Sequence, residues 1–213
     1  MRTIYLSLFI LYFLGACKTP AVNNISKIPA ATSYNNFLVL YVDNNFETFR
    51  FDKDAYNLFV KDALVDPEHQ RERAAMENFL YKEMTPYAHC IKSIDVLHAT
   101  NNSYESFRHL TDSLKVDAIL LVTLSKKSVD RYQYPGSSAA RGTGDYNGPH
   151  EYNALNATFD TYLLAADNKQ PMWIARTDMK NKSEYRGKTG LKRKFAGVIT
   201  KALQKEGYLL EIK

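Results

Sequence analysis

Two short apolar runs constrain the fold of this chain more than any other feature. The segments NFLVLYV (36–42) and DAILLVTL (117–124) are rich in aliphatic, β-branched and aromatic residues, which is typical of buried strands. Helical spacing of apolar residues falls between them, at 67–84 and again from Ser103 to Leu114, with a looser alternation at 90–99 that predicts a strand. The order strand, helix, strand, helix, strand indicates parallel pairing through crossovers. A further short helix is predicted from a cap at Asp54 to Leu64.

The pattern changes after this unit. Residues 131–151 are polar and Gly-rich and predict a long loop, followed by a hairpin of strands at 153–165 and 173–177. Apolar residues from Leu191 to Leu203 repeat at helical spacing, and Gly207 follows as a C-cap. The fold class is therefore α/β with a single mixed sheet, and an α+β arrangement is the alternative.

The N-terminus has the layout of a secretory signal peptide. Arg2 is followed by an apolar run from Ile4 to Leu14 and then by small residues. That run is about half of the roughly 20 residues that a membrane-spanning helix needs. We therefore predict a signal peptide at 1–16, a flexible Pro- and Asn-rich tether at 17–35 and one domain at 36–213.

The residues Leu14-Gly15-Ala16-Cys17 resemble the lipobox of bacterial lipoproteins. The resemblance implies that Cys17 becomes the acylated first residue of the mature chain, which anchors the protein in a membrane. Two or more acyl chains, as such proteins carry, hold a protein stably. The aspartate that retains such proteins in the inner membrane is absent after the cysteine, where Lys18 stands instead. This favours the outer membrane, facing either the periplasm or the exterior.

The distribution of charge along the chain indicates which classes of partner the protein could bind. The chain has 213 residues with a formal net charge of +5, and its 45% apolar content argues against disorder. The excess of positive charge lies from Arg176 to the C-terminus, where eleven Lys or Arg face four Asp or Glu. Such a segment suits nucleic acid, anionic lipid or acidic polysaccharide, although a solvated lysine-rich helix face is the simpler interpretation. Export argues against nucleic acid.

The phrases FRHLTDSLKVDAILLVTLS and TFDTYLLAADNKQPMWIARTD resemble the small α/β domain shared by several envelope lipoproteins and accessory proteins. Members include the N-terminal domain of the TolB translocation protein and the core of the curli-secretion lipoprotein. The shared hairpin turn corresponds to Asp167, Lys169 and Trp173, whereas Lys115-Val116 replace the usual glycine before the central strand. The resemblance implies this fold and an envelope compartment.

The sequence does not specify a catalytic site or a cofactor. It lacks the nucleophile elbow, the zinc-protease helix and the phosphate-binding loop. No metal site is predicted from His89, Cys90, His98 and His109, because adjacent His89 and Cys90 would point to opposite faces of a strand. We expect Cys90 to behave as a small buried apolar residue.

Aromatic and basic residues instead mark the predicted loop as a binding surface. Aromatic faces accompanied by polar donors suit sugars or a protein partner. The candidate partner-binding residues are Tyr132, Tyr134, Arg141, Tyr146 and Tyr152. The sequence thus favours a non-enzymatic, lipid-anchored envelope protein that contacts another protein, and the alternative is a lipoprotein that binds glycan or peptidoglycan.

Overall fold

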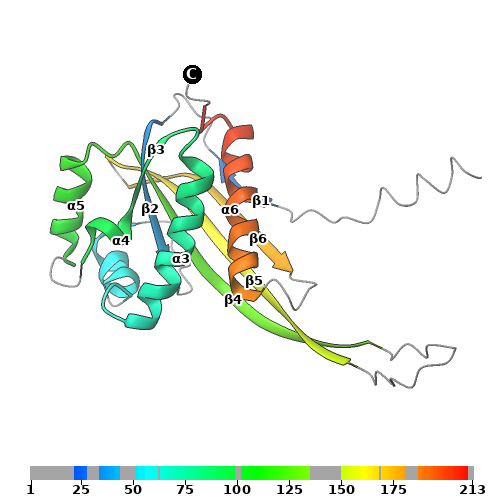
Figure 1. Ribbon diagram of the computed structural model, residues 1–213. Coiled ribbons are helices and arrows are strands. Elements are labelled where there is room, and N and C mark those ends of the chain that lie inside the picture. The colour runs from blue at the N-terminus through cyan, green and yellow to red at the C-terminus, as the bar shows by residue number, and fades with distance from the viewer. Residues whose placement is uncertain are drawn as a thin grey trace, which may run out of the picture.

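The computed structural model describes residues 22–27, 34–43, 51–61, 63–98, 102–134, 150–167, 169–180 and 187–210. These form one six-stranded mixed sheet between two layers of helices (Figure 1). The elements, in chain order, are β1 (Val22–Lys27), β2 (Asn36–Val42), α2 (Lys53–Ala55), the π-helical turn η1 (Tyr56–Val60), α3 (Pro67–Met84), β3 (His89–Lys92), α4 (Ser93–Val96), α5 (Tyr104–Ser113), β4 (Ala118–Tyr134), β5 (His150–Ala165), β6 (Pro171–Lys180) and α6 (Gly187–Lys205).

The strands lie in the order β1-β6-β5-β4-β2-β3. β2 pairs in parallel with both β3 and β4, while β4, β5 and β6 form an antiparallel meander. The predicted α/β class, the parallel unit, the hairpin and the C-terminal helix are confirmed.

The two apolar runs are buried on both faces of the sheet. Alternate residues of β2 enter different cores, because successive side chains of a strand point to opposite faces. Phe37, Val39 and Tyr41 pack with α3 and α6, while Leu38 and Leu40 pack with the layer that contains η1 and α5. Continuous burial of this kind explains why the runs lack polar alternation.

Several boundaries follow local chemistry. The Asp66 carboxylate accepts from the backbone N–H of Glu68 and Pro67 begins α3, while Ser103 caps α5 through the N–H of Ser106. After α6, Gly207 has a φ of 83°, the left-handed conformation expected of its predicted capping role.

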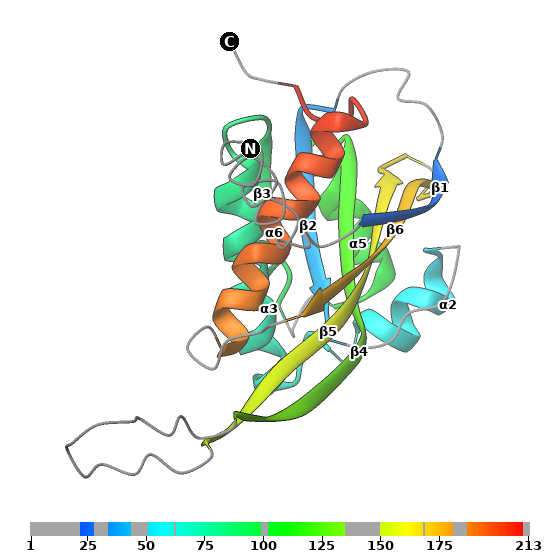
Figure 2. The ribbon, with the colours of Figure 1, turned by 90° about the vertical axis from the view of Figure 1, so that its right-hand side faces the viewer.

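Three predictions of local structure were wrong. The first is the cap of the short helix, which is Asp52 rather than Asp54, because the Asp52 side chain accepts from the N–H of Ala55; the helix continues as η1. The second is the strand at 90–99, which ends at Lys92 and is followed by α4. The third is the flexible tether, since its central residues 22–27 form β1, paired antiparallel with β6 at the edge of the sheet (Figure 2).

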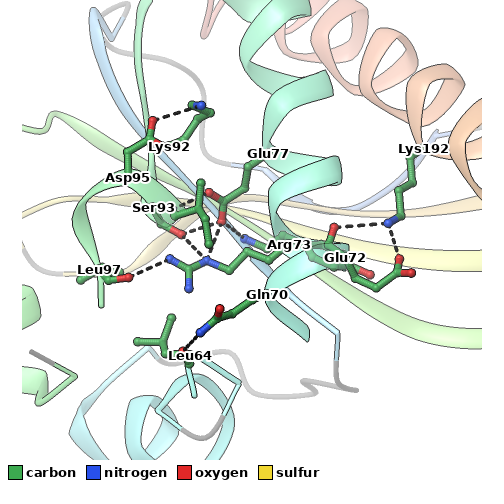
Figure 3. Close-up of polar contacts among 12 residues, drawn as sticks. Leu64, Gln70, Glu72, Arg73, Glu77, Lys92, Ser93, Asp95, Leu97 and Lys192 are labelled. Atoms are coloured by element: carbon green, nitrogen blue, oxygen red, sulfur yellow. Dashed lines mark hydrogen bonds and ion pairs between the residues drawn. The ribbon is translucent and has the colours of Figure 1, made fainter. Parts of the chain in front are cut away.

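A buried ionic network, of which the sequence gives no sign, explains the early end of β3. Glu77 Oε1 accepts from Arg73 Nε at 3.2 Å and from Ser93 Oγ at 2.6 Å (Figure 3). It also accepts from the backbone N–H of Tyr41 at 3.1 Å. Its Oε2 accepts from the N–H of Ile94 at 2.8 Å. The carboxylate therefore binds β2 beyond its last pair with β3, Val39–Lys92, and also binds the start of α4.

Candidate functional site

The main projection of the molecule is a two-stranded ribbon formed by β4 and β5. Pairing of β4 with β2 ends at Thr123, and pairing of β5 with β6 begins at Asn156. Beyond these points β4 and β5 pair only with each other among the described residues, as far as Tyr134 and His150. We call residues 124–134 and 150–155 the ribbon; it extends away from the sheet and helices (Figures 1 and 2).

A β-bulge lies at the base of the ribbon. The register of β4 shifts between Leu124 and Lys126, which places Ser125 as the extra residue. Bulges bend a strand and increase its twist, so this is where the ribbon changes direction. Ser125 Oγ donates to Asp160 Oδ2 at 2.6 Å, and Arg176 donates to both oxygens of Asp160 at 2.7 and 2.8 Å. The buried carboxylate thus ties the bulge to β6.

One face near the ribbon base forms a polar groove of about 310 Å³. Within it, Asn156 donates to Asp130 and Thr158 donates to Asp178, each at 2.6 Å. Lys126 and Lys180 also line the groove. The groove therefore contains positively charged donors, from lysine, and negatively charged acceptors, from aspartate. Such a mixture suits a ligand rich in hydroxyl groups.

The opposite face is more apolar. Val129 is 56% exposed and pairs with the half-buried Leu155. A small cavity of about 30 Å³ adjoins this face, lined in part by Tyr41 and by the Glu72–Lys192 ion pair. Burial raises the pKa of Tyr41 well above its ordinary value, and the charges of Asp43 and Glu72 add to that effect.

The structure brings together three of the five candidate partner-binding residues. In the backbone register Tyr132 pairs with Tyr152, and Tyr134 pairs with His150. The strands therefore extend into both ends of the predicted 131–151 loop, because β4 reaches Tyr134 and β5 starts at His150. Arg141 and Tyr146 lie outside the described residues, as does Cys17.

The histidines considered above as metal ligands lie on different elements. His89, His98 and His109 are exposed, on β3, after α4 and on α5 respectively. In the described part of the chain, no three His, Cys, Asp or Glu side chains come close enough to hold a metal ion. Cys90 is buried, and burial raises the pKa of its thiol to about 12, as expected for a packing residue.

No protein-family model and no curated protein matches the chain. Solved structures do resemble it. The PelC dodecamer from Paraburkholderia phytofirmans matches with 15% identity over 88% of this chain and 96% of that chain, with a TM-score of 0.42. The lipoprotein GNA1162 from Neisseria meningitidis matches with 10% identity over 80% of this chain and 99% of that chain, also with a TM-score of 0.42.

A helix that crosses a bilayer must be long and apolar. None of the helices in the described ranges combines the length and the apolar character that a membrane span requires.

Proposed function

We propose that this chain is a non-enzymatic accessory protein of the bacterial envelope, anchored in the outer membrane through acylated Cys17, that binds a protein partner with its ribbon. The observation that carries the proposal is the ribbon itself. A two-stranded projection is marginally stable alone in water, so a long one suits contact with another molecule. The Tyr132–Tyr152 register pair adds side chains that bury large areas at low entropic cost.

The anchor is tested by fractionation of cells. Cys17→Ser should move the protein from the membrane fraction to the soluble fraction, whereas Cys90→Ser should leave it in the membrane. Persistent sedimentation of the Cys17→Ser protein with membranes would contradict the anchor.

The partner is tested by photo-cross-linking in intact cells. A photoreactive residue at Val129 should capture one stoichiometric protein, and Tyr132→Ala with Tyr152→Ala should reduce capture at least tenfold. The control position is Leu58 on η1, which is similarly exposed at 66%. It lies away from the ribbon, in the helical layer on the other side of the sheet from α3 and α6. Equal capture from both positions, or none from Val129, would reject the ribbon as the contact.

The polar groove favours a second candidate, the binding of glycan or peptidoglycan. Lys126, Asn156 and Asp178 provide the donors and acceptors that sugar hydroxyls require. Retention of the protein by insoluble cell-wall material, lost on Asn156→Ala with Asp178→Ala, would support this candidate. Failure of the wild-type protein to bind at low salt would exclude it.

A further inference from the structure

The exposed face of α6 carries a basic stripe of four residues. Arg193, Lys194, Lys201 and Lys205 are exposed, and helical spacing places them within one arc of the helix surface. The sequence of α6 contains no acidic residue. The opposite arc, which includes Phe195 and Ile199, packs on the sheet.

Local acidic groups neutralise little of this stripe. Among the described residues, Lys194, Lys201 and Lys205 have no ion-pair partner, and the Arg193 guanidinium lies over the Phe79 ring at 5.4 Å. α3 brings Glu83 near the stripe, beside Gly197. Because little acidic charge within the domain offsets the stripe, its positive charge is available to bind an external anionic surface.

The position of β1 shortens the chain between Cys17 and the folded sheet. If residues 18–35 formed a free tether, the domain could stand about 60 Å from Cys17. Because β1 begins at Val22, only five residue steps, about 18 Å at full extension, separate Cys17 from the folded sheet. β1 in turn contacts the C-terminal end of α6, where Asn24 Nδ2 donates to Glu206 Oε1 at 3.1 Å.

We propose that the basic stripe of α6 binds anionic phospholipid headgroups and so lays the domain against the membrane that holds Cys17. The orientation rests on the proposed acylation of Cys17, whereas the affinity of the stripe for headgroups does not. Each Lys or Arg beside an anionic bilayer strengthens attachment about fivefold, and salt weakens it.

The test uses the unacylated mature chain, residues 17–213 with Cys17→Ser, which keeps all of the sheet and both cores. Sedimentation with vesicles of phosphatidylglycerol and phosphatidylcholine should exceed sedimentation with pure phosphatidylcholine at least tenfold at low salt. Neutralising the stripe with Lys194→Gln, Lys201→Gln and Lys205→Gln should remove most of that difference.

The matched control removes three other exposed charges, with Lys53→Gln, Lys61→Gln and Lys115→Gln, and should retain binding. Thermal unfolding verifies that both triple variants remain folded. Equal loss in the two variants, or no preference of the wild type for the anionic vesicles, would overturn the proposal. The vesicle test uses an unacylated protein, so its outcome does not depend on whether Cys17 is acylated in cells. Likewise, the fractionation test of Cys17 does not depend on whether the stripe binds headgroups.

Discussion

Glu77 links α3 to β2 and to α4 in the interior. Its side chain is fully buried and accepts hydrogen bonds from two side chains and from the backbone of β2 and α4. Burial raises the pKa of its carboxyl, and the Arg73 guanidinium partly offsets this. The spacing of four residues between Arg73 and Glu77 predicts an ion pair on one face of a helix. The sequence does not show that this pair is buried, because charged residues usually lie at the surface.

Glu77→Ala should lower the free energy of unfolding by about 3–5 kcal/mol, because it leaves Arg73 buried without a counter-charge. Glu83→Ala, at an exposed position of the same helix, should change it by less than about 0.5 kcal/mol. Urea denaturation measures both. A double variant, Arg73→Met with Glu77→Met, should be less destabilised than Glu77→Ala; greater destabilisation would argue against the unpaired charge as the cause.

Cys90 and Tyr56 give stability a defined pH dependence. Burial raises the pKa of the Cys90 thiol from 9.0 to about 12 and that of the Tyr56 hydroxyl from 10.0 to about 12. The unfolded chain therefore loses these protons first, and the stability present below about pH 9 is lost as the pH rises toward 12. Cys90→Ala should reduce the slope of unfolding free energy against pH by up to about 1.4 kcal/mol per unit between pH 9.5 and 11.5. An unchanged slope in urea titrations would show that the thiol ionises normally in the fold.

At the scale of elements, the ends of two helices could be predicted from the sequence, whereas the cap of the short helix could not, since it is Asp52 and not Asp54. Gly207 performs the capping role that the sequence predicts, and Ser103, predicted as the start of a helix, caps α5. β1 was not readable, because VNNISK has neither an apolar run nor alternation and is a strand only through its pairing with β6. The end of β3 was also missed, since it depends on the distant carboxylate of Glu77.

A side-chain hydrogen bond to the core adds to the backbone pairing of β1 with β6. The indole N–H of buried Trp173 donates to Asn24 Oδ1 at 3.1 Å. Asn24→Ala should leave that donor unsatisfied and destabilise the fold by about 1–3 kcal/mol. Since Trp173 is the only tryptophan, its fluorescence should also change in the folded state. Asn23→Ala, at the neighbouring exposed position, is the control, and equal effects of the two changes would dismiss the hydrogen bond as the cause.

For the whole molecule, the sequence was sufficient to predict the α/β class with a single mixed sheet, but not the placement of the site. Continuous burial of β2 and the start of β4 dictates helices on both faces, and the structure has them. The loop predicted at 131–151 includes the outer part of the ribbon, where β4 continues to Tyr134 and β5 begins at His150, because the polar sequence there lacks the apolar alternation of a half-buried sheet. Three candidate tyrosines nevertheless lie on the ribbon, since aromatic residues mark it independently of its secondary structure.

The short connection from Cys17 to β1 makes a prediction about the assembled protein in its membrane. If β1 holds the domain at a fixed height, inserting fifteen Gly and Ser residues between Pro20 and Ala21 should leave membrane attachment and thermal stability unchanged. The insertion raises the contour length of the connection from about 18 Å to about 70 Å, so the ribbon samples a much larger volume. Capture of the partner from Val129 should then fall several-fold, because the effective concentration of the ribbon at the partner falls as the connection to the anchor lengthens.

The matched control inserts the same segment between Pro29 and Ala30, after β1, where it lengthens the chain without changing the distance from the anchor to the sheet. Capture from Val129 should stay at the wild-type level in this protein. Equal reductions from the two insertions would mean that the added segment itself interferes. No reduction from either would mean that the partner binds the ribbon whatever its height above the membrane, because a flexible connection that costs no capture cannot be setting the geometry of the complex.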